Sequence, residues 1–376
     1  MVFSFFAKEK KDDSLALIID IGSASVGSAL VRFAGEKSTS KTNKGPHVLA
    51  TSREIIPFQE ALSTTPFLFA MNRALGKSLK AILHKIGNRG APAHIYCTLS
   101  SPWFIAKTRH THISRESAFK VDEKKLASFL DEDLVKLKEE LKDILPINDT
   151  VVVEKKIIQM KLNGYEVKNP YGQTTSQMEV VATISLSSDK VIESIEREIG
   201  HFFHAGSVNF GSFPLAAYSA VGDIFPEEKS FLFVDITGEA TDISLVINEV
   251  MLGTISFPRG KNFFVREISA EFKTLHEEAG TLLSMFLRDA LNGKSREAVS
   301  TVVKRGNTEW STRFEKALMA LAKEAQIPNT VFFTSDPDVV SLFAGLINNL
   351  KLESAINGSF EARYLDHYIV TSFATF

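Results

Sequence analysis

Residues 15–33, LALIIDIGSASVGSALVRF, are the stretch from which the fold can be predicted. An apolar run ends at Gly22 and Ser23, and a strand-like pattern resumes at Val26. Two apolar runs separated by a short turn of small residues predict a β-hairpin. Residues 231–247 repeat this pattern, with apolar runs on both sides of the turn ITGEATD, which indicates an internal duplication.

Helices and strands alternate around these hairpins. Apolar residues recur at helical spacing over residues 67–86, and residues 94–99 form another short apolar run. A helix is also expected at residues 189–203, and strands are expected at residues 250–257 and 330–333. This alternation is typical of an α/β sheet.

Residues 102–188 have a different character. Asp122 is placed to cap a long amphipathic helix, and residues 151–162 and 165–167 flank an Asn-Gly pair that favours a tight hairpin turn. A third strand is expected at residues 178–186. A helix on a small antiparallel sheet predicts a separate α+β subdomain, inserted between the α/β segments.

These patterns divide the chain into successive segments. The expected boundaries are an N-terminal segment at 1–12, a first lobe at 13–101, the inserted subdomain at 102–188, a return to the first lobe at 189–230, a second lobe at 231–345 and a C-terminal segment at 346–376. Residues 362–373 lack a basic apolar stripe, so we expect a strand or a docked tail there and no amphipathic membrane helix.

The composition is that of an ordinary soluble protein. The 376 residues carry a formal net charge of -2, which gives no overall field that would draw the chain onto nucleic acid. The single cysteine, Cys97, lies in an apolar run, so we expect a buried thiol in a reducing compartment. The sequence shows neither a run of about 18 apolar residues nor a cleavable leader, which predicts a protein that does not span a membrane and is not secreted.

The first residues contain an apolar and basic segment. Residues 1–7 are rich in phenylalanine and are followed by Lys8, Lys10 and Lys11. Aromatic side chains beside lysines suit a bilayer interface, although so short a segment binds weakly by itself. We therefore expect either a weak membrane contact here or a segment packed on its own domain.

Residues 20–27, DIGSASVG, resemble the first phosphate-binding hairpin of the superfamily that contains actin, sugar kinases and chaperone ATPases. Residues 235–242 resemble the second phosphate loop, and residues 214–217, PLAA, resemble the start of the helix that connects the two halves. Residues 163–172, NGYEVKNPYG, are similar to a hairpin of the inserted subdomain in the bacterial cell-division protein FtsA and its relative PilM of type IV pili. The resemblance implies an α/β, two-lobed actin-like (ribonuclease H-like) ATPase fold with an inserted small α+β subdomain.

The same resemblance implies a site for ATP and Mg²⁺ between the lobes. Phosphates need backbone N–H groups at turns without bulky side chains, and Mg²⁺ needs carboxylates that hold it through water. Asp20 and Asp235 are the candidate Mg²⁺ carboxylates. The candidate nucleotide-binding residues are Asp20, Gly22, Ser23, Ser25, Asp235, Thr237, Gly238, Glu239, Thr241, Lys261 and Ser335.

The sequence departs from the superfamily's pattern at three places. Thr237 and Glu239 stand where relatives have further glycines, and Glu239 would bring negative charge toward phosphates. Phe213 stands where hydrolytic relatives carry an acidic residue that orients water, and residues 334–337 replace a Gly-Gly turn beside the adenosine. Lys261 could contact a phosphate, pair with Glu239 or lie in a solvated turn. We expect a partly degenerate ATP site with no hydrolysis or very slow hydrolysis.

Two functions fit these features. The first is an actin-like cytoplasmic scaffold at the inner face of the cell membrane, acting in cell division like FtsA or in type IV pilus assembly like PilM. Inner-membrane proteins would be its partners, and the inserted subdomain would serve partner binding or self-association. The alternative is a sugar-kinase-like phosphotransferase, which would need an added substrate domain and a catalytic aspartate in the cleft. The candidate partner-binding residues are Asn163, Gly164, Tyr165, Asn169 and Pro170.

Overall fold

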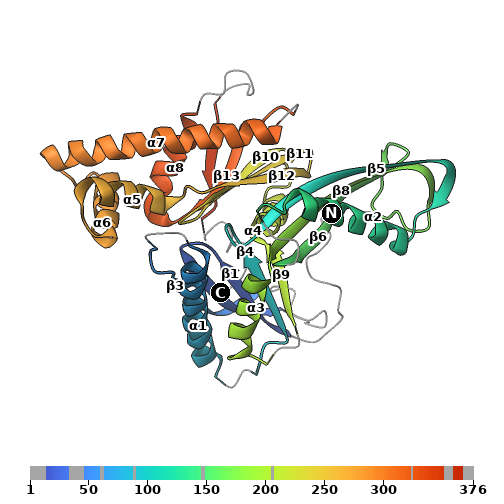
Figure 1. Cartoon of the computed structure of the whole chain (residues 1–376), viewed down its shortest axis with the longest axis horizontal. Coiled ribbons are helices and arrows are strands. Elements are labelled where there is room, and N and C mark those ends of the chain that lie inside the picture. Colours follow the sequence, from blue (N-terminus) through green and yellow to red (C-terminus); the bar gives the residue numbers. More distant parts are fainter. Residues whose placement is uncertain are drawn as a thin grey trace.

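Two lobes of the molecule contain sheets of the same topology (Figure 1). The structure is a computed structural model that describes residues 14–33, 46–59, 63–87, 90–144, 149–204, 207–322, 325–350 and 359–366. The first lobe's sheet has the order β3-β2-β1-β4-β9. Its strands are β1 (Ser14–Ile21), β2 (Ser25–Phe33), β3 (His47–Ile55), β4 (His94–Leu99) and β9 (Val208–Ser212). β1 and β2 pair antiparallel, as the predicted hairpin requires, whereas β1 and β4 pair parallel.

The second lobe repeats this arrangement in the order β12-β11-β10-β13-β14. Its strands are β10 (Phe231–Ile236), β11 (Thr241–Ile247), β12 (Val250–Phe257), β13 (Thr330–Ser335) and β14 (Glu361–Tyr364). Again the first pair is antiparallel and the pairing of β10 with β13 is parallel, so the duplication seen in the sequence is a duplication of structure. β14 pairs with β13, which extends this sheet beyond residue 345 and confirms a strand near the end of the chain.

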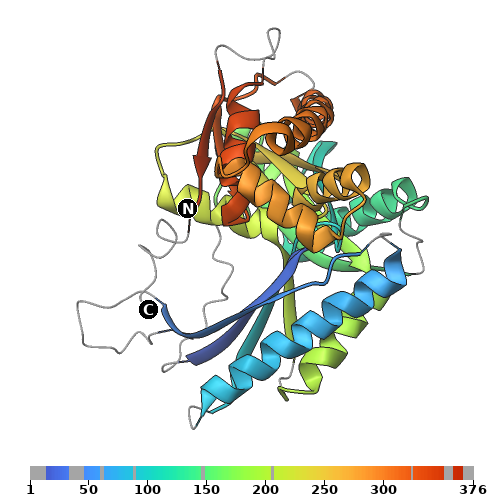
Figure 2. The same cartoon turned by 90° about the vertical axis from the view of Figure 1, so that its left-hand side faces the viewer.

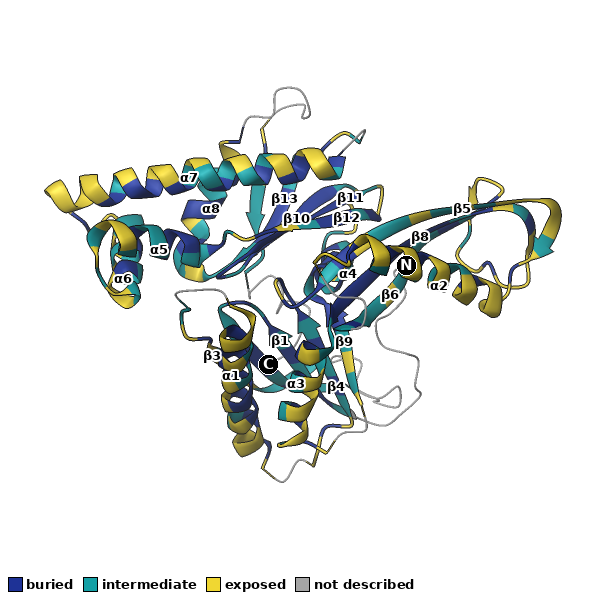
Figure 3. Ribbon diagram, viewed as in Figure 1, coloured by how far each residue is buried: buried dark blue, intermediate teal, exposed yellow. Residues whose placement is uncertain are grey.

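Helices cover the faces of the two sheets (Figures 1 and 3). In the first lobe, α1 packs on β2 and β3 because its apolar residues lie on one side, with Met71, Leu75 and Leu79 fully buried. The remaining helices of the lobes are α3 (Asp189–Gly200), α4 (Phe213–Ile224), α5 (Lys261–Phe272), α6 (His276–Leu287), α7 (Gly293–Ala322) and α8 (Val340–Asn348), with α1 at Thr64–Ile86 and a 3-10 turn, η2, at Pro337–Val339.

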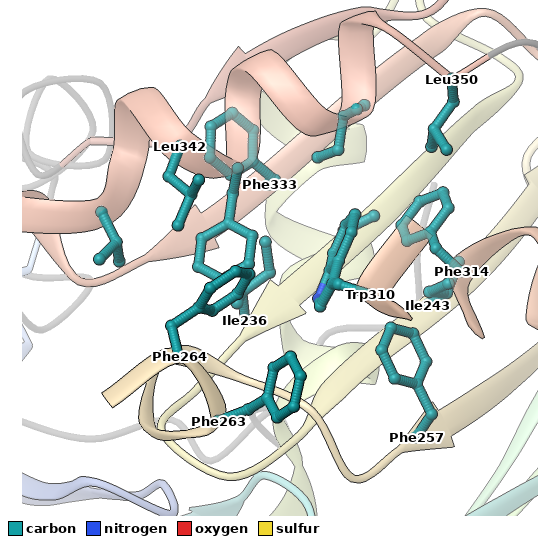
Figure 4. Close-up of a cluster of buried hydrophobic side chains, with 14 of the residues drawn as sticks. Ile236, Ile243, Phe257, Phe263, Phe264, Trp310, Phe314, Phe333, Leu342 and Leu350 are labelled. Carbon is teal, nitrogen blue, oxygen red and sulfur yellow. The ribbon is translucent and has the colours of Figure 1, made fainter. Parts of the chain in front are cut away.

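The core of the second lobe is built around aromatic side chains (Figure 4). Trp310 of α7 is fully buried and stacks on Phe314, with 4.9 Å between the ring centroids. Its Nε1 donates to Thr241 Oγ1 at 3.2 Å, at the point where β11 begins. Aromatic groups of this size contribute most of the burial in a core, and here they fix the turn that precedes β11.

The inserted subdomain is a four-stranded antiparallel sheet of order β5-β8-β6-β7, which projects from the lobes in Figure 1. Its elements are β5 (Ile105–Lys120), α2 (Glu123–Glu140), β6 (Thr150–Leu162), β7 (Tyr165–Glu166) and β8 (Thr174–Ser188). The Asp122 side chain accepts from the backbone N–H of Lys125 at 2.8 Å, which confirms the predicted helix cap. Asn163 and Gly164 have φ values of 48° and 82°, as the predicted tight turn requires.

Other expectations can also be checked. Cys97 is buried within β4, at 1% exposure. No helix among the described residues is long and apolar enough to cross a membrane. The apolar and basic segment at residues 1–11 lies outside the described residues.

Candidate nucleotide site between the lobes

The two hairpin turns, residues 22–24 and 237–240, meet directly between the lobes. Ser23 Oγ lies 2.7 Å from Thr237 Oγ1, and it also accepts from the backbone N–H of Glu239 at 2.8 Å. A Cβ atom built on Gly238 would lie 2.5 Å from the Cβ of Ala24. That separation is far shorter than any van der Waals contact, so the turn at Gly238 already touches the first hairpin. The two turns are therefore in direct contact at Ala24 and Gly238 as well as at Ser23 and Thr237.

The first hairpin is further tied to its own lobe by Arg53 of β3. This guanidinium donates to Asp20 Oδ2 and to Ser25 Oγ, both at 2.8 Å. Trp103 Nε1 donates to the carbonyl of Gly22 at 2.8 Å, and the N–H of Gly22 donates to the Ser25 carbonyl at 3.1 Å. The positive charge beside the Asp20 carboxylate is thus supplied by the protein.

Glu239 is not an unpaired charge. Its carboxylate is only 4% exposed and lies 2.6 Å from a guanidinium nitrogen of Arg266. Asn262 Nδ2 donates to the same carboxylate at 2.7 Å. Arg266 also donates to the backbone carbonyl of Gln59 in the first lobe at 2.9 Å, and its guanidinium lies 4.6 Å from the ring centre of Phe58. Glu239 thus forms part of a contact between the lobes, with its charge compensated.

Lys261 does not pair with Glu239, nor does it lie in a solvated turn. Its Nζ is 3.1 Å from Asp336 and 2.9 Å from Asp338. Partial burial lowers the pKa of the Lys261 ammonium group, but the two carboxylates outweigh burial and leave that pKa raised. The backbone of Lys261 donates to the carbonyl of Thr237 at 3.1 Å, and this approach requires glycine at position 260, because a Cβ there would lie 2.1 Å from the same oxygen.

Asp235 and Asp242 face each other across the second hairpin, as register partners on β10 and β11. Both are buried, at 5% and 1% exposure. Burial and the neighbouring Asp242 charge raise the pKa of Asp235 to about 7, despite a hydrogen bond from Thr334 Oγ1 at 2.8 Å. Burial also raises the pKa of Asp242, which accepts from the N–H of Ser101 in the first lobe at 3.2 Å. When two carboxyls are buried as neighbours on paired strands, the protonated form of at least one of them is favoured.

The remaining predicted residues lie at different depths. Thr241 is fully buried, and its hydroxyl donates to the Arg259 carbonyl at 2.7 Å, so it belongs to the core of the second lobe. Ser335 is the last residue of β13, where it pairs with Ile236 of β10. It directly precedes Asp336, to which Lys261 is paired. Phe213 begins α4 and packs toward Phe233, with 6.1 Å between the ring centroids.

Several groups of the predicted Mg-ATP site are already paired within the protein. The N–H groups of Gly22, Thr237 and Glu239 already donate to protein oxygens and are not offered to a phosphate. Of the two candidate carboxylates, Asp20 is paired with Arg53, and Asp235 is buried with a pKa of about 7. A hydrated Mg²⁺ needs ionised, accessible carboxylates.

The hairpin of the inserted subdomain lies at an edge of its sheet, because β7 pairs only with β6 among the described strands. Tyr165 is 79% exposed, whereas Pro170 is buried. Asn163 Oδ1 accepts from Thr175 Oγ1 at 2.8 Å and from the N–H of Gln177 at 3.1 Å, and Asn169 Oδ1 accepts from the N–H of Tyr171 at 3.2 Å. The asparagines therefore shape the hairpin, and Tyr165 presents a large aromatic side chain to solvent.

Several residues of this region could not be found from the sequence. Three of them lie far along the chain from the residues that they contact, and no sequence spacing indicates these contacts: Arg53, Trp103 and Gln59. Asn262 and Arg266 are an exception, since residues four apart on a helix share a face. That spacing would have indicated that both could bind one carboxylate.

Comparison with known proteins supports the same architecture. No protein-family model matches the chain, and no curated protein matches its sequence. Among solved structures, a PilM-PilN type IV pilus biogenesis complex matches with a TM-score of 0.63 at 12% identity, over 98% of this chain and 91% of that chain. The ethanolamine utilization protein EutJ from Carboxydothermus hydrogenoformans matches with a TM-score of 0.46 at 11% identity, over 94% of this chain and 86% of that chain. The chain therefore has an actin-like ATPase fold, as predicted from its sequence.

Proposed function

We propose that this protein is an actin-like scaffold of the PilM type, which works in the cytoplasm at the inner face of the cell membrane and has lost Mg-ATP binding. The observation that carries the proposal is the direct contact between the two hairpin turns, where Ser23 Oγ lies 2.7 Å from Thr237 Oγ1. Binding a phosphate there requires this contact and the bond from the Glu239 N–H to be broken. The cost of leaving such buried polar groups unpaired opposes nucleotide binding.

The inserted subdomain supports the scaffold part of the proposal. The similar solved structure is a complex of PilM with PilN. In this chain the edge strand β7 and the exposed ring of Tyr165 form a surface to which an extended segment of a partner can add. We propose pilus-assembly proteins of the inner membrane as the partners, with FtsA-like cell division as the related alternative.

Calorimetry with Mg-ATP tests the proposed loss of the nucleotide site. We expect no binding up to millimolar ATP for the wild-type protein, and no phosphate transfer to small polyols. A variant that combines Arg53→Ala with Ser23→Gly removes the guanidinium beside Asp20 and the hydroxyl that joins the hairpins. Binding of Mg-ATP by this variant and not by the wild type would show that these two contacts oppose nucleotide binding. Micromolar binding by the wild type would contradict the proposal, and measurable kinase activity would favour the phosphotransferase alternative.

The partner surface is tested separately by photo-crosslinking in cells of the source organism. A photoreactive residue at position 165 should be captured by an inner-membrane protein of pilus assembly or cell division. The same residue at position 275, which is also an exposed apolar position (Leu275, 67% exposed), is the control. Capture of the same protein from both positions, or of soluble metabolic enzymes only, would count against a scaffold that binds through this hairpin.

A further inference from the structure

The outward face of α1 carries positive charge with no negative charge on the same helix. Arg73, Lys77, Lys80 and His84 are exposed on it, and the sequence of α1 contains neither aspartate nor glutamate. At 3.6 residues per turn, these four positions and the exposed residues Phe69 and Leu83 fall within roughly 120° of the helix circumference. They form one stripe about 20 Å long. We call this set of six residues the α1 face.

Apolar side chains lie at both ends of the α1 face. Phe69 is 71% exposed in the second turn of the helix, and Leu83 is 43% exposed near its end. Figure 2 shows α1 running across the front of the molecule with no other element over it, and Figure 3 shows this outer side as exposed. The stripe is therefore a convex surface, with cations in the middle and apolar groups at both ends.

The cations of the α1 face form no ion pair with the part of the chain that the structure describes. Within the described residues, no ion pair joins Arg73, Lys77 or Lys80 to a carboxylate. In contrast, Arg305 on α7 pairs with two glutamates, and Lys125 pairs with Asp122 at the start of α2. Glu198 of α3 covers the buried Gly76, which lies between Phe69 and Leu83 on the helix circumference, and this contact leaves the cations of the stripe exposed.

The beginning of the described chain lies at the same end of the lobe as the C-terminal end of α1. The N–H of Ala93 donates to the carbonyl of Leu15 at 2.8 Å, and Ala16 pairs with His94 on β4, only a few residues after α1 ends at Ile86. Residues 1–11, which contain six apolar residues and three lysines, precede β1 in the chain.

We propose that the α1 face binds directly to an anionic lipid surface, as a second contact beside the segment at residues 1–11. A bilayer with acidic headgroups accepts cations over a broad area, and its interface accepts Phe69 and Leu83 between the headgroups. A single weak apolar segment gives only reversible membrane binding, and stable attachment takes two signals. A convex helix face offers no groove for an extended protein segment, whereas a bilayer surface can contact it along its whole length. The inference deepens the proposed location at the inner membrane face and rests on it.

Flotation of the purified full chain with vesicles tests the proposal. We expect binding to vesicles of phosphatidylcholine with added phosphatidylglycerol, little binding to phosphatidylcholine alone, and weakening by high NaCl, which screens exposed charges. Replacing Lys77→Gln together with Lys80→Gln should weaken partitioning roughly thirtyfold. Phe69→Ser should weaken it as well, without a change in circular dichroism.

A matched control removes two exposed lysines from another helix. Lys294→Gln with Lys304→Gln on α7 changes the net charge equally and should leave flotation unchanged. Equal loss in both double variants would show a general charge effect and overturn the proposal. Loss on deleting residues 1–11 with no effect of the α1 variants would also overturn it. If the pure protein does not bind vesicles but co-fractionates with native membranes, the lipid contact is refuted, while the proposed scaffold function stands.

Discussion

Replacing Asp235 by asparagine should stabilise the protein at alkaline pH and not at acidic pH. The residue is 5% exposed, and its pKa is raised from 3.8 to about 7. Between these values the folded protein holds a proton that the unfolded chain releases. The unfolding free energy therefore falls as pH rises through this range, and it reaches its lower plateau above pH 7.

The size of the effect follows from the shift. One pKa unit corresponds to about 1.4 kcal/mol, so the ionised carboxylate costs up to about 4 kcal/mol at pH 8. Asparagine is neutral at every pH and keeps an acceptor for Thr334 Oγ1, which now lies 2.8 Å from Asp235 Oδ1. At roughly 2–4 °C per kcal/mol, Asp235→Asn should raise the melting temperature by several degrees at pH 8.

Thermal melts of both proteins from pH 5 to pH 8 provide the measurement, and the difference between them is the quantity of interest. Asp223→Asn is the control, since Asp223 is exposed on α4 and its replacement should give no pH-dependent difference. If Asp235→Asn lowers stability most at pH 8, the carboxylate is ionised and held by a favourable partner. A melting temperature that rises with Mg-ATP in the wild type but not in this variant would mean that Asp235 belongs to a working nucleotide site.

Two further substitutions test the contact between the lobes. Glu239→Gln should lower the free energy of unfolding in urea by about 3–5 kcal/mol, because Arg266 is left half-buried without its counter-charge. The control Glu309→Gln changes a carboxylate that is 39% exposed and should lower it by less than about 1 kcal/mol. Equal losses in the two variants would contradict the importance of burial at Glu239. Gly238→Val should separate the hairpin turns and increase proteolysis between the lobes, because a Cβ at this position would lie 2.5 Å from the Cβ of Ala24. The control Gly280→Ala on α6, where nothing lies within 4 Å of the added Cβ, should stabilise the protein by up to about 1 kcal/mol. Unchanged proteolysis in Gly238→Val would show that the turns are not in firm contact.

The sequence analysis predicted several elements that have a regular apolar pattern, but it did not place β3, β9 or the helices α5 to α8. Both hairpins, α1, α2 and the Asn163-Gly164 turn lie where periodicity and turn residues placed them. β5 was missed, because from Lys107 to Lys120 it is polar and largely exposed, with no clear alternation of apolar residues. An edge strand that buries little on either face gives no such signal.

The chemistry of the candidate site was harder to predict, since it depends on contacts between distant segments. The sequence suggested that Glu239 would repel phosphates, but its charge is compensated by Arg266, which no local pattern connects to the turn. The raised pKa of Asp235 likewise depends on the depth of the second hairpin in the core. Residue types at a turn indicate a site, while the protonation and pairing of those residues are set by the tertiary structure.

Three of the contacts between the lobes resist a hinge motion that would open the space between the hairpins, and they support the proposed scaffold. The hairpin turns meet through Ser23 and Thr237, Asp242 accepts from the Ser101 N–H, and Arg266 donates to the carbonyl of Gln59. The three contacts involve different segments of each lobe, so a hinge motion that opens the space between the hairpins has to break bonds at the turns and strain the other two contacts. A ligand can shift a conformational equilibrium only by its difference in affinity for the two states. Because Gly22, Thr237 and Glu239 already use their N–H groups within the protein, fewer donors are available to a phosphate to offset that cost.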